Sequence, residues 1–238
     1  MPAGWFTFEQ PFLSKLCAAV LISGSGTNLQ AFIDEVAAGQ LELDLSVVLS
    51  NRPDAAGLER ARNANIIVEC IRHQDYAQRA LYDAALVETL DKYQPDVIIL
   101  AGFMRILTGT FVNHFSGRVL NIHPSLLPKF PGLDTHQRAI DAGEEWHGST
   151  VHFVTEELDG GPVIIQGRVP VRPGDSAMEL ATRVLAVEHR IYPEAARLLV
   201  AGRIECRDGA AWLDGERLFE PLQCQGQSRA LTPKPWAG

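Results

Sequence analysis

Short apolar runs alternate with helix-like patterns along the first half of the chain, and this alternation limits the fold more than any other feature. Strands are expected at Leu16–Ser23, Leu45–Ser50, Ile66–Cys70, Asp96–Ala101 and Val119–His123, and helices at Leu29–Ala38, Ala56–Ala64, Tyr76–Tyr93 and Thr108–Phe115. Strands that alternate with helices are typical of a parallel sheet with right-handed crossovers. The pattern therefore predicts an α/β protein with a Rossmann-like, open, mostly parallel twisted sheet and helices on both faces.

The pattern changes after Pro131. Two strands, Ser149–Val154 and Pro162–Val171, are expected to pair as a hairpin or to extend the sheet. A long helix, Ala177–Val200, is expected to be interrupted near Pro193, and a short hairpin should follow it. We expect an N-terminal extension over residues 1–14, a single domain over 15–220 and a loose tail over 221–238. The domain would combine an N-terminal phosphate-binding half with a C-terminal half that completes the site.

The composition excludes several classes of protein. With 238 residues the chain can bury a substantial core, and its net charge of −8 and lack of a basic run argue against a nucleic-acid partner. Four scattered cysteines without a C-x-x-C pair indicate reduced thiols in a cytoplasmic protein and no structural zinc site. No apolar run approaches the length of a transmembrane helix, so no membrane partner is expected.

The stretch VLNIHPSLLPKFPG begins as a strand and then breaks at prolines. Side chains alternate faces along a strand, so Asn121 and His123 share one face, and Pro124 cannot continue a central ladder. The amide and the imidazole therefore lie together at the carboxyl end of a strand, where open α/β sheets bind ligands. The competing interpretation is a hydrogen-bonded structural histidine beside a turn-capping asparagine.

The segment SGSGTN lies between the first expected strand and helix. The N–H groups of Gly26, Thr27 and Asn28 would form the anion site at a helix N-terminus, which fits a monophosphate. A dinucleotide is disfavoured because the third glycine of the fingerprint is missing and the second strand ends in Ser50–Asn51 without an acid. The alternative is that the glycines form only a turn.

The segment TEELDGGP places Asp159 before two glycines. A carboxylate close to His123 would favour the protonated imidazole and fix its orientation, whereas a solvated surface turn is the alternative. Without further information, Arg79 and Glu188 are interpreted as exposed residues on helices. The segment Met104–Leu107 is interpreted as part of the hydrophobic core, and His152 as a structural histidine.

SGSGTNLQ, LAGFMRIL, LNIHPSLLPKFPG, HGSTVHFV and ELDGGPVI occur in this order between about Leu16 and Leu218. Together they resemble the folate-dependent phosphoribosylglycinamide formyltransferase family of purine biosynthesis. The resemblance implies the formyltransferase fold and a catalytic trio of Asn121, His123 and Asp159. It implies ribotide contacts from Gly26, Thr27, Asn28, Leu185, Ala186, Val187 and Glu188. It implies folate contacts from Arg79, Met104, Arg105, Ile106, Leu107, Asn121, Thr155, Glu156, Glu157, Leu158 and Asp159. Ser25 and Asp134 depart from the family pattern, and Asp134 lies near the expected site.

The resemblance implies direct transfer of the formyl group of 10-formyltetrahydrofolate to the amine of phosphoribosylglycinamide through a tetrahedral intermediate, without a metal. The partners expected are these small molecules, with the chain a monomer or a homodimer. One alternative is a 10-formyltetrahydrofolate hydrolase, which normally carries a regulatory domain ahead of the formyl domain. Another is a non-catalytic folate- or phosphate-binding module. A methionyl-tRNA formyltransferase is disfavoured, because the expected extra C-terminal domain and basic surface are absent from the sequence.

Overall fold

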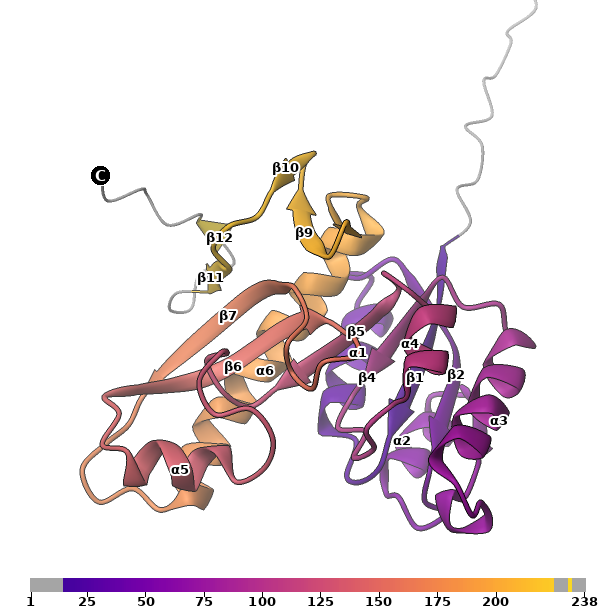
Figure 1. Ribbon diagram of the computed structural model, residues 1–238, viewed down its shortest axis with the longest axis horizontal. Helices are drawn as coiled ribbons and strands as arrows, with labels where there is room; N and C mark the ends of the chain where they lie inside the picture. The colour runs from indigo at the N-terminus through magenta and orange to yellow at the C-terminus, as the bar shows by residue number, and fades with distance from the viewer. Residues whose placement is uncertain (1–14, 225–230, 233–238) are drawn as a thin grey trace, which may run out of the picture.

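A computed structural model describes residues 15–224 and 231–232, and its main feature is one nine-stranded sheet (Figure 1). The sheet order is β12-β11-β7-β6-β5-β4-β1-β2-β3. Its strands are β1 (Leu16–Ile22), β2 (Leu43–Ser50), β3 (Ile67–Cys70), β4 (Val97–Leu100), β5 (Val119–His123), β6 (Trp146–Phe153), β7 (Val163–Pro170), β11 (Leu222–Cys224) and β12 (Leu231–Thr232). The five strands β1–β5 are parallel, and β6 joins β5 antiparallel, so the expected mostly parallel open sheet is confirmed.

Helices cover both faces of this sheet. They are α1 (Thr27–Ala37), α2 (Gly57–Asn63), α3 (Arg79–Asp91), α4 (Gly109–His114), α5 (Thr135–Asp141) and α6 (Ala177–Val200), with the short 3-10 helix η1 (His73–Asp75) before α3. In β1, Val20 belongs to the core with α1, α2 and α6, whereas the next residue, Leu21, belongs to the core with α3 and α4. The alternation of side chains along a central strand therefore supplies both cores.

Helix α6 runs without a break through Pro193, so the predicted interruption is wrong. A proline removes one backbone hydrogen bond from a helix, but burial of its neighbours offsets that loss. Ile191, Tyr192 and Ala195 are all 0% exposed, and the Tyr192 hydroxyl donates to the carbonyl groups of Leu100 and Leu120. Tertiary packing on both sides of Pro193 therefore keeps the helix continuous through it.

The chain after α6 contains more structure than the expected hairpin and loose tail. The expected hairpin, β8 (Ile204–Arg207) and β9 (Ala210–Leu213), extends to a three-stranded sheet with β10 (Glu216–Arg217). Residues 222–224 are not loose: β11 pairs parallel with β7, and Leu222 is 2% exposed because it packs into the core of α1, α2 and α6. The expected extension, residues 1–14, and most of the expected tail lie outside the described residues.

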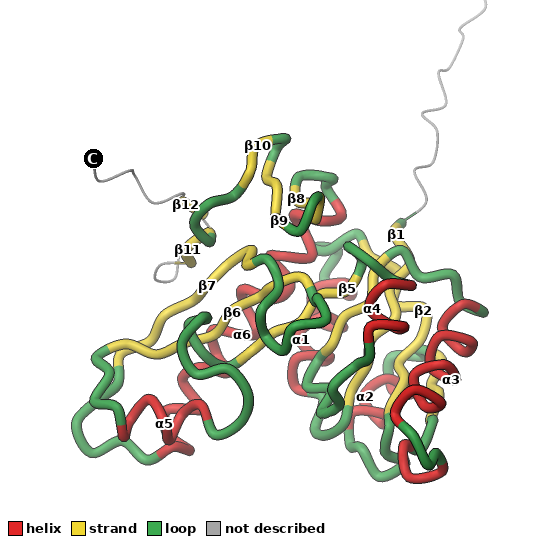
Figure 2. The backbone as a smooth tube through the Cα atoms, viewed as in Figure 1, coloured by secondary structure: helices red, strands yellow, loops and turns green. Residues whose placement is uncertain are grey.

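Two long connections reach His123 at the carboxyl end of β5, through Phe130 in one and Asp159 in the other. One joins β5 to α5, and the other joins β6 to β7 (green in Figure 2). Helix α5 was not expected, since it follows a proline-rich stretch. Among the described residues, no helix is long and apolar enough to cross a membrane.

Candidate functional site

Three loops meet where neighbouring parallel strands end. In the sheet β1 has β2 on one side and β4 on the other, so the chain changes direction between β1 and β4. Open α/β sheets bind ligands at such a switch point, outside the carboxyl ends of the strands. The loop 23–26 follows β1, the loop 101–108 follows β4, and the residues Asn121 and His123 end β5. The topology therefore gathers the expected phosphate, folate and catalytic residues at the carboxyl ends of β1, β4 and β5.

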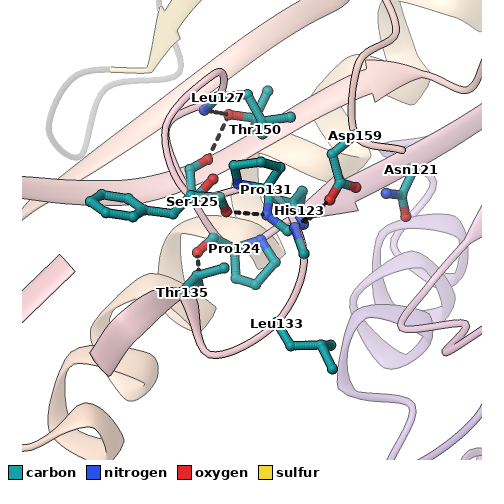
Figure 3. A network of polar contacts seen from close by, with 12 residues as sticks. Asn121, His123, Pro124, Ser125, Leu127, Pro131, Leu133, Thr135, Thr150 and Asp159 are labelled. Atoms are coloured by element: carbon teal, nitrogen blue, oxygen red, sulfur yellow. Dashed lines mark hydrogen bonds and ion pairs between the residues drawn. The ribbon is translucent and has the colours of Figure 1, made fainter. Parts of the chain in front are cut away.

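The expected catalytic trio comes together at the end of β5. Figure 3 shows Asp159 facing His123, with Asn121 beside them. The Nδ1 atom of His123 lies 3.4 Å from Asp159 Oδ2, and both side chains are more than nine-tenths buried. The same Asp159 oxygen accepts the backbone N–H of Gly132 at 2.8 Å. This second contact ties the loop after β5 to the loop between β6 and β7.

Both ring nitrogens of His123 face acceptors. Its Nε2 atom lies 2.9 Å from the carbonyl oxygen of Phe130, which only accepts, and Nδ1 faces the Asp159 carboxylate. A neutral imidazole carries one N–H and could serve only one of these acceptors, whereas the imidazolium carries two. Each ring nitrogen of His123 therefore has an acceptor within 3.4 Å.

A buried histidine fixes the orientation of the Asn121 amide. His152 is 2% exposed, and burial lowers its pKa, so the ring is neutral at physiological pH. Its Nδ1–H donates to the carbonyl of Phe153 at 2.8 Å, which leaves Nε2 as an acceptor 3.2 Å from the Asn121 amide nitrogen. One amide N–H is thereby held by His152, and the other is left for a ligand. The sequence predicted a structural role for His152 but not its contact with Asn121.

The loop before α1 needs glycine for two reasons. Gly26 has a left-handed φ of 68°, and a Cβ atom there would lie 2.6 Å from the Cα atom of Gly57. The close approach of these two glycines, together with the hydrogen bond from Gly57 N–H to Gly24 O, packs α2 against the loop. The first N–H groups of the eleven-residue helix α1 are then presented at the sheet edge, where they provide a positive helix terminus.

Glu188 links this loop to β6. Its carboxylate accepts the amide N–H of Asn28 at 2.8 Å, and its other oxygen lies 3.1 Å from the Ser149 hydroxyl in β6. Burial raises the pKa of Glu188, and the hydrogen bonds from Asn28 and Ser149 oppose that rise. Glu188 is therefore a nearly buried acid at the site, not the surface residue that helical spacing alone favoured. Of its expected neighbours Leu185–Val187, Val187 packs beside Gly167 of β7, and Ala186 is exposed.

The expected folate residues lie on two loops and one helix. Met104 and Ile106 are exposed apolar side chains on the loop after β4, where Leu107 is buried and Arg105 half-buried. The segment Thr155–Asp159 crosses from β6 towards β7, and Glu156 in it accepts a hydrogen bond from Asn113 of α4 at 2.8 Å. Leu158 is exposed as well, and Arg79 is the exposed first residue of α3. Apolar side chains next to charged ones suit a flat, partly polar ligand.

A cavity of about 450 Å³ joins the loop before α1 to the loop after β4. Its wall includes Gly26–Asn28 and Met104–Arg105, which the sequence predicted. It also includes Asn51, Arg52 and His73 from the ends of β2 and β3, which sequence reasoning did not assign to a site. The Asn51–His73 contact joins residues far apart in the chain, so the sequence carried no pattern for it.

Two further histidines meet behind the loop after β5. His136 Nδ1 lies 3.1 Å from His147 Nε2, and burial lowers the pKa of His147 to about 4. The sequence showed no ligand-like histidine cluster, and this contact pairs only two of them. Within the described part of the chain, no group of three or more His, Cys, Asp or Glu side chains is arranged to hold a metal ion.

Comparison with known proteins identifies the family. The formyl transferase family model matches residues 17–196. Phosphoribosylglycinamide formyltransferase of Escherichia coli is 52% identical over 199 residues, which span 84% of this chain and 94% of that protein. The structure of the phosphoribosylglycinamide formyltransferase of Coxiella burnetii has a TM-score of 0.81 and 49% identity, and the match covers 85% of this chain and 95% of that one.

A formyltetrahydrofolate deformylase from Pseudomonas syringae shares the fold at a TM-score of 0.78 and 25% identity. The match covers 84% of this chain but 66% of that chain. The sequence is thus about twice as similar to the transferases as to this deformylase, over a larger share of the related chain. The family model covers most of this chain, and the matches to the two transferases cover nearly all of those proteins. This chain therefore belongs to the formyl transferase family.

Proposed function

We propose that this protein transfers the formyl group of 10-formyltetrahydrofolate to the amine of phosphoribosylglycinamide. The products are formylglycinamide ribotide and tetrahydrofolate, in the biosynthesis of purines. The observation that carries the proposal is the contact of Asp159 with His123 beside Asn121, one strand from the folate loop and two from the phosphate loop. A phosphorylated amine and a formyl donor can meet at the carboxyl ends of these strands.

The ribotide would bind through its phosphate and its ribose. The phosphate suits the N–H groups at the start of α1, in the segment Gly26–Asn28, where the helix dipole favours an anion. The ribose hydroxyls suit the Glu188 carboxylate, which Asn28 and Ser149 hold in place. The shared contact of Asn28 and Glu188 keeps the two parts of this binding site at a fixed separation. Leu185–Val187 immediately precede Glu188 in α6 and would border this site.

The folate would lie between the Met104–Leu107 loop and the Thr155–Asp159 loop. The exposed side chains of Met104, Ile106 and Leu158 offer apolar contact to its ring. Arg79, at the start of α3, would meet the carboxylates of its glutamate tail. Binding the two substrates from opposite sides aligns amine and formyl carbon and removes most of the entropic cost of their encounter.

The reaction begins when the amine nitrogen attacks the formyl carbon. A C–N bond forms, and the carbonyl electrons move to oxygen, giving a tetrahedral oxyanion. The free amide N–H of Asn121 donates to this oxygen, and the positive charge of His123 stabilises it. Since Phe130 accepts from His123 Nε2, a direct contact of that nitrogen with the oxyanion needs the loop after β5 to release it.

The intermediate collapses when the bond from carbon to the folate nitrogen breaks. The amine nitrogen loses a proton, and the leaving folate nitrogen gains one, so charges and atoms balance. Asp159 stabilises the imidazolium of His123 and, with His123, relays this proton through the site. No residue of the chain becomes formylated, and no metal takes part in the scheme.

The decisive experiment measures loss of the formyl group with and without phosphoribosylglycinamide. Loss that depends on the ribotide and yields formylated ribotide supports the transferase. Equal loss in its absence, with release of formate, identifies a hydrolase. Binding of both ligands without any loss of the formyl group identifies a non-catalytic module.

A further inference from the structure

We propose that Asp83 of α3 is a positioning residue for folate: its buried carboxylate holds the folate-lining loop 104–108 in place. The proposal rests on the proposed function, in which this loop forms one wall of the folate site. Asp83 does not belong to the phosphate, ribose, folate or catalytic residues assigned above. Its role would be to hold the loop and α3 together, without touching the substrate.

Asp83 is an unusual acid for its surroundings. It is 0% exposed and sits among the apolar residues of the core formed with α3 and α4. Its Oδ2 atom accepts the backbone N–H of Thr108 at 2.6 Å, and Thr108 is the last residue before α4. A buried carboxylate is strongly unfavourable unless it is hydrogen-bonded, so this contact fixes where Thr108 must lie.

The other end of the loop has an anchor of the same kind. The backbone N–H of Met104 donates to the Ser23 hydroxyl at 2.8 Å, and that hydroxyl donates to Asn51 Oδ1 at 2.6 Å. Ser23 and Asn51 are themselves nearly buried. The loop between Met104 and Thr108 therefore carries exposed apolar side chains while a buried polar side chain holds the backbone at each end. Such an arrangement preorganises a binding surface.

Several buried polar atoms at this junction have no hydrogen-bond partner among the described residues. In the described part of the chain, Asp83 Oδ1, Tyr82 Oη, Arg105 Nε and Thr108 Oγ1 are all buried without a hydrogen-bond partner. Buried polar atoms are normally paired, so a group of unpaired atoms beside a binding loop points to a functional constraint instead of optimal packing. Asp83 Oδ1 and Thr108 Oγ1 lie at the Asp83 end of the loop, and Arg105 Nε belongs to a side chain that the folate site would use.

Asp83 also connects the loop to Arg79. The two residues are four positions apart in α3, and residues at this spacing lie on one side of a helix. By holding Thr108, Asp83 sets the distance between the first turn of α3 and the folate loop. The geometry therefore predicts that Arg79 and Asp83 act on the same substrate and that their effects are coupled.

The test compares variants at Asp83 by their KM for each substrate. In Asp83→Ala and the similarly sized Asp83→Leu, we expect the KM for 10-formyltetrahydrofolate to rise about tenfold or more, because the buried acceptor that holds the Thr108 N–H is lost. The ribotide KM and the kcat at saturating folate should stay within about twofold of the parent, since neither depends on the lost contact. Asp83→Asn keeps an oxygen that accepts the same N–H and should restore most of the folate affinity.

Leu90→Ala is the matched control, because Leu90 is also 0% exposed in α3 but lies at the far end of the helix. It should lower thermal stability without changing the folate KM. In the Arg79→Ala/Asp83→Ala double variant, the loss of folate affinity should be smaller than the product of the two single losses. An unchanged folate KM in both Asp83→Ala and Asp83→Leu, or an equal rise for both substrates, overturns the proposal.

Calorimetric binding of tetrahydrofolate separates this proposal from the proposed function. If the parent binds tetrahydrofolate but shows no ribotide-dependent transfer, the function is wrong, and the Asp83 variants still test the loop by their affinity. If the parent transfers the formyl group and the Asp83 variants bind tetrahydrofolate as tightly as the parent, only the positioning role fails.

Discussion

The carboxylate of Asp159 meets two groups at once: His123 Nδ1 at 3.4 Å and the backbone N–H of Gly132 at 2.8 Å. In the proposed mechanism it combines an electrostatic role towards the His123 ring with a structural role, the attachment of the loop after β5. The two roles can be separated because an amide oxygen still accepts the Gly132 N–H but carries no charge.

Asp159→Asn should keep the loop in place and lose the electrostatic role. We expect kcat to fall by about 10²–10⁴-fold, the range that a positioned acid–base group contributes, with the ribotide KM nearly unchanged. Asp159→Ala loses both roles and should also lower the thermal stability. Steady-state kinetics and thermal unfolding on the same preparations check this. A kcat within about threefold of the parent in Asp159→Asn would remove Asp159 from catalysis.

Asn121→Ala removes the donor that His152 holds towards the site. The loss of one preorganised oxyanion donor lowers kcat by about 10²–10³-fold, and we expect that range here. Since His152 is neutral and accepts from the amide, His152→Phe should release the Asn121 side chain and lower kcat less than Asn121→Ala does. The double variant should be no slower than Asn121→Ala, because His152 would act only through Asn121. An additive loss in rapid-quench measurements would contradict this order.

The catalytic strand and most of the sheet were predictable, whereas the contacts that orient the site were not. Strand β5 was expected at its observed bounds, because apolar residues alternate with polar ones from Leu120 and the run ends at Pro124. Helix α5 was missed because it follows a proline-rich stretch, and the break at Pro193 was wrong because burial of its neighbours is a tertiary effect. The acceptor of His123 is the backbone carbonyl of Phe130, and backbone groups carry no sequence identity.

The sequence motifs predicted the residues of the trio and of the phosphate loop. They did not predict the residues that hold these groups in position. Asp83 and Thr108 are 25 positions apart and join different elements, so no local pattern connects them. The same holds for Asn28 and Glu188, which are 160 positions apart. Contacts of this range follow from the chain topology, which fixes which loops lie side by side.

Glu188→Gln tests the ribose contact. The amide keeps the shape of the side chain but loses its charge and one acceptor oxygen, so the ribotide KM should rise about tenfold to a hundredfold, the range for a hydrogen bond to a charged group. The folate KM should stay near the parent value. Burial raises the folded-state pKa of Glu188, so its ionisation destabilises the fold as pH rises through that range. The variant should accordingly be no less stable than the parent at pH 7, which urea unfolding measures.

The buried His147 should make the fold sensitive to acid. Burial lowers its pKa from 6.5 to about 4, so the unfolded chain binds a proton more readily than the folded one. The stability from this residue is complete above about pH 6.5 and is lost as the pH falls towards 4, by at most about 3 kcal/mol. His147→Gln should flatten this part of the curve of unfolding free energy against pH.

Two adjacent glycines next to Asp159 offer the sharpest structural test. A Cβ atom at Gly161 would lie 1.8 Å from the carbonyl oxygen of Phe153, a backbone atom in β6, whereas at Gly160 the nearest atoms belong to the exposed side chain of Glu157. Gly161→Ala must therefore move the loop that carries Asp159 away from β6, while Gly160→Ala requires only that Glu157 turn aside. We expect Gly161→Ala to lower kcat by at least about tenfold, because even a displacement of 1 Å is costly at a reacting centre. Gly160→Ala should keep kcat within about threefold of the parent. Equal activity of the two variants would show that the loop position does not depend on the close packing of Gly161 against β6.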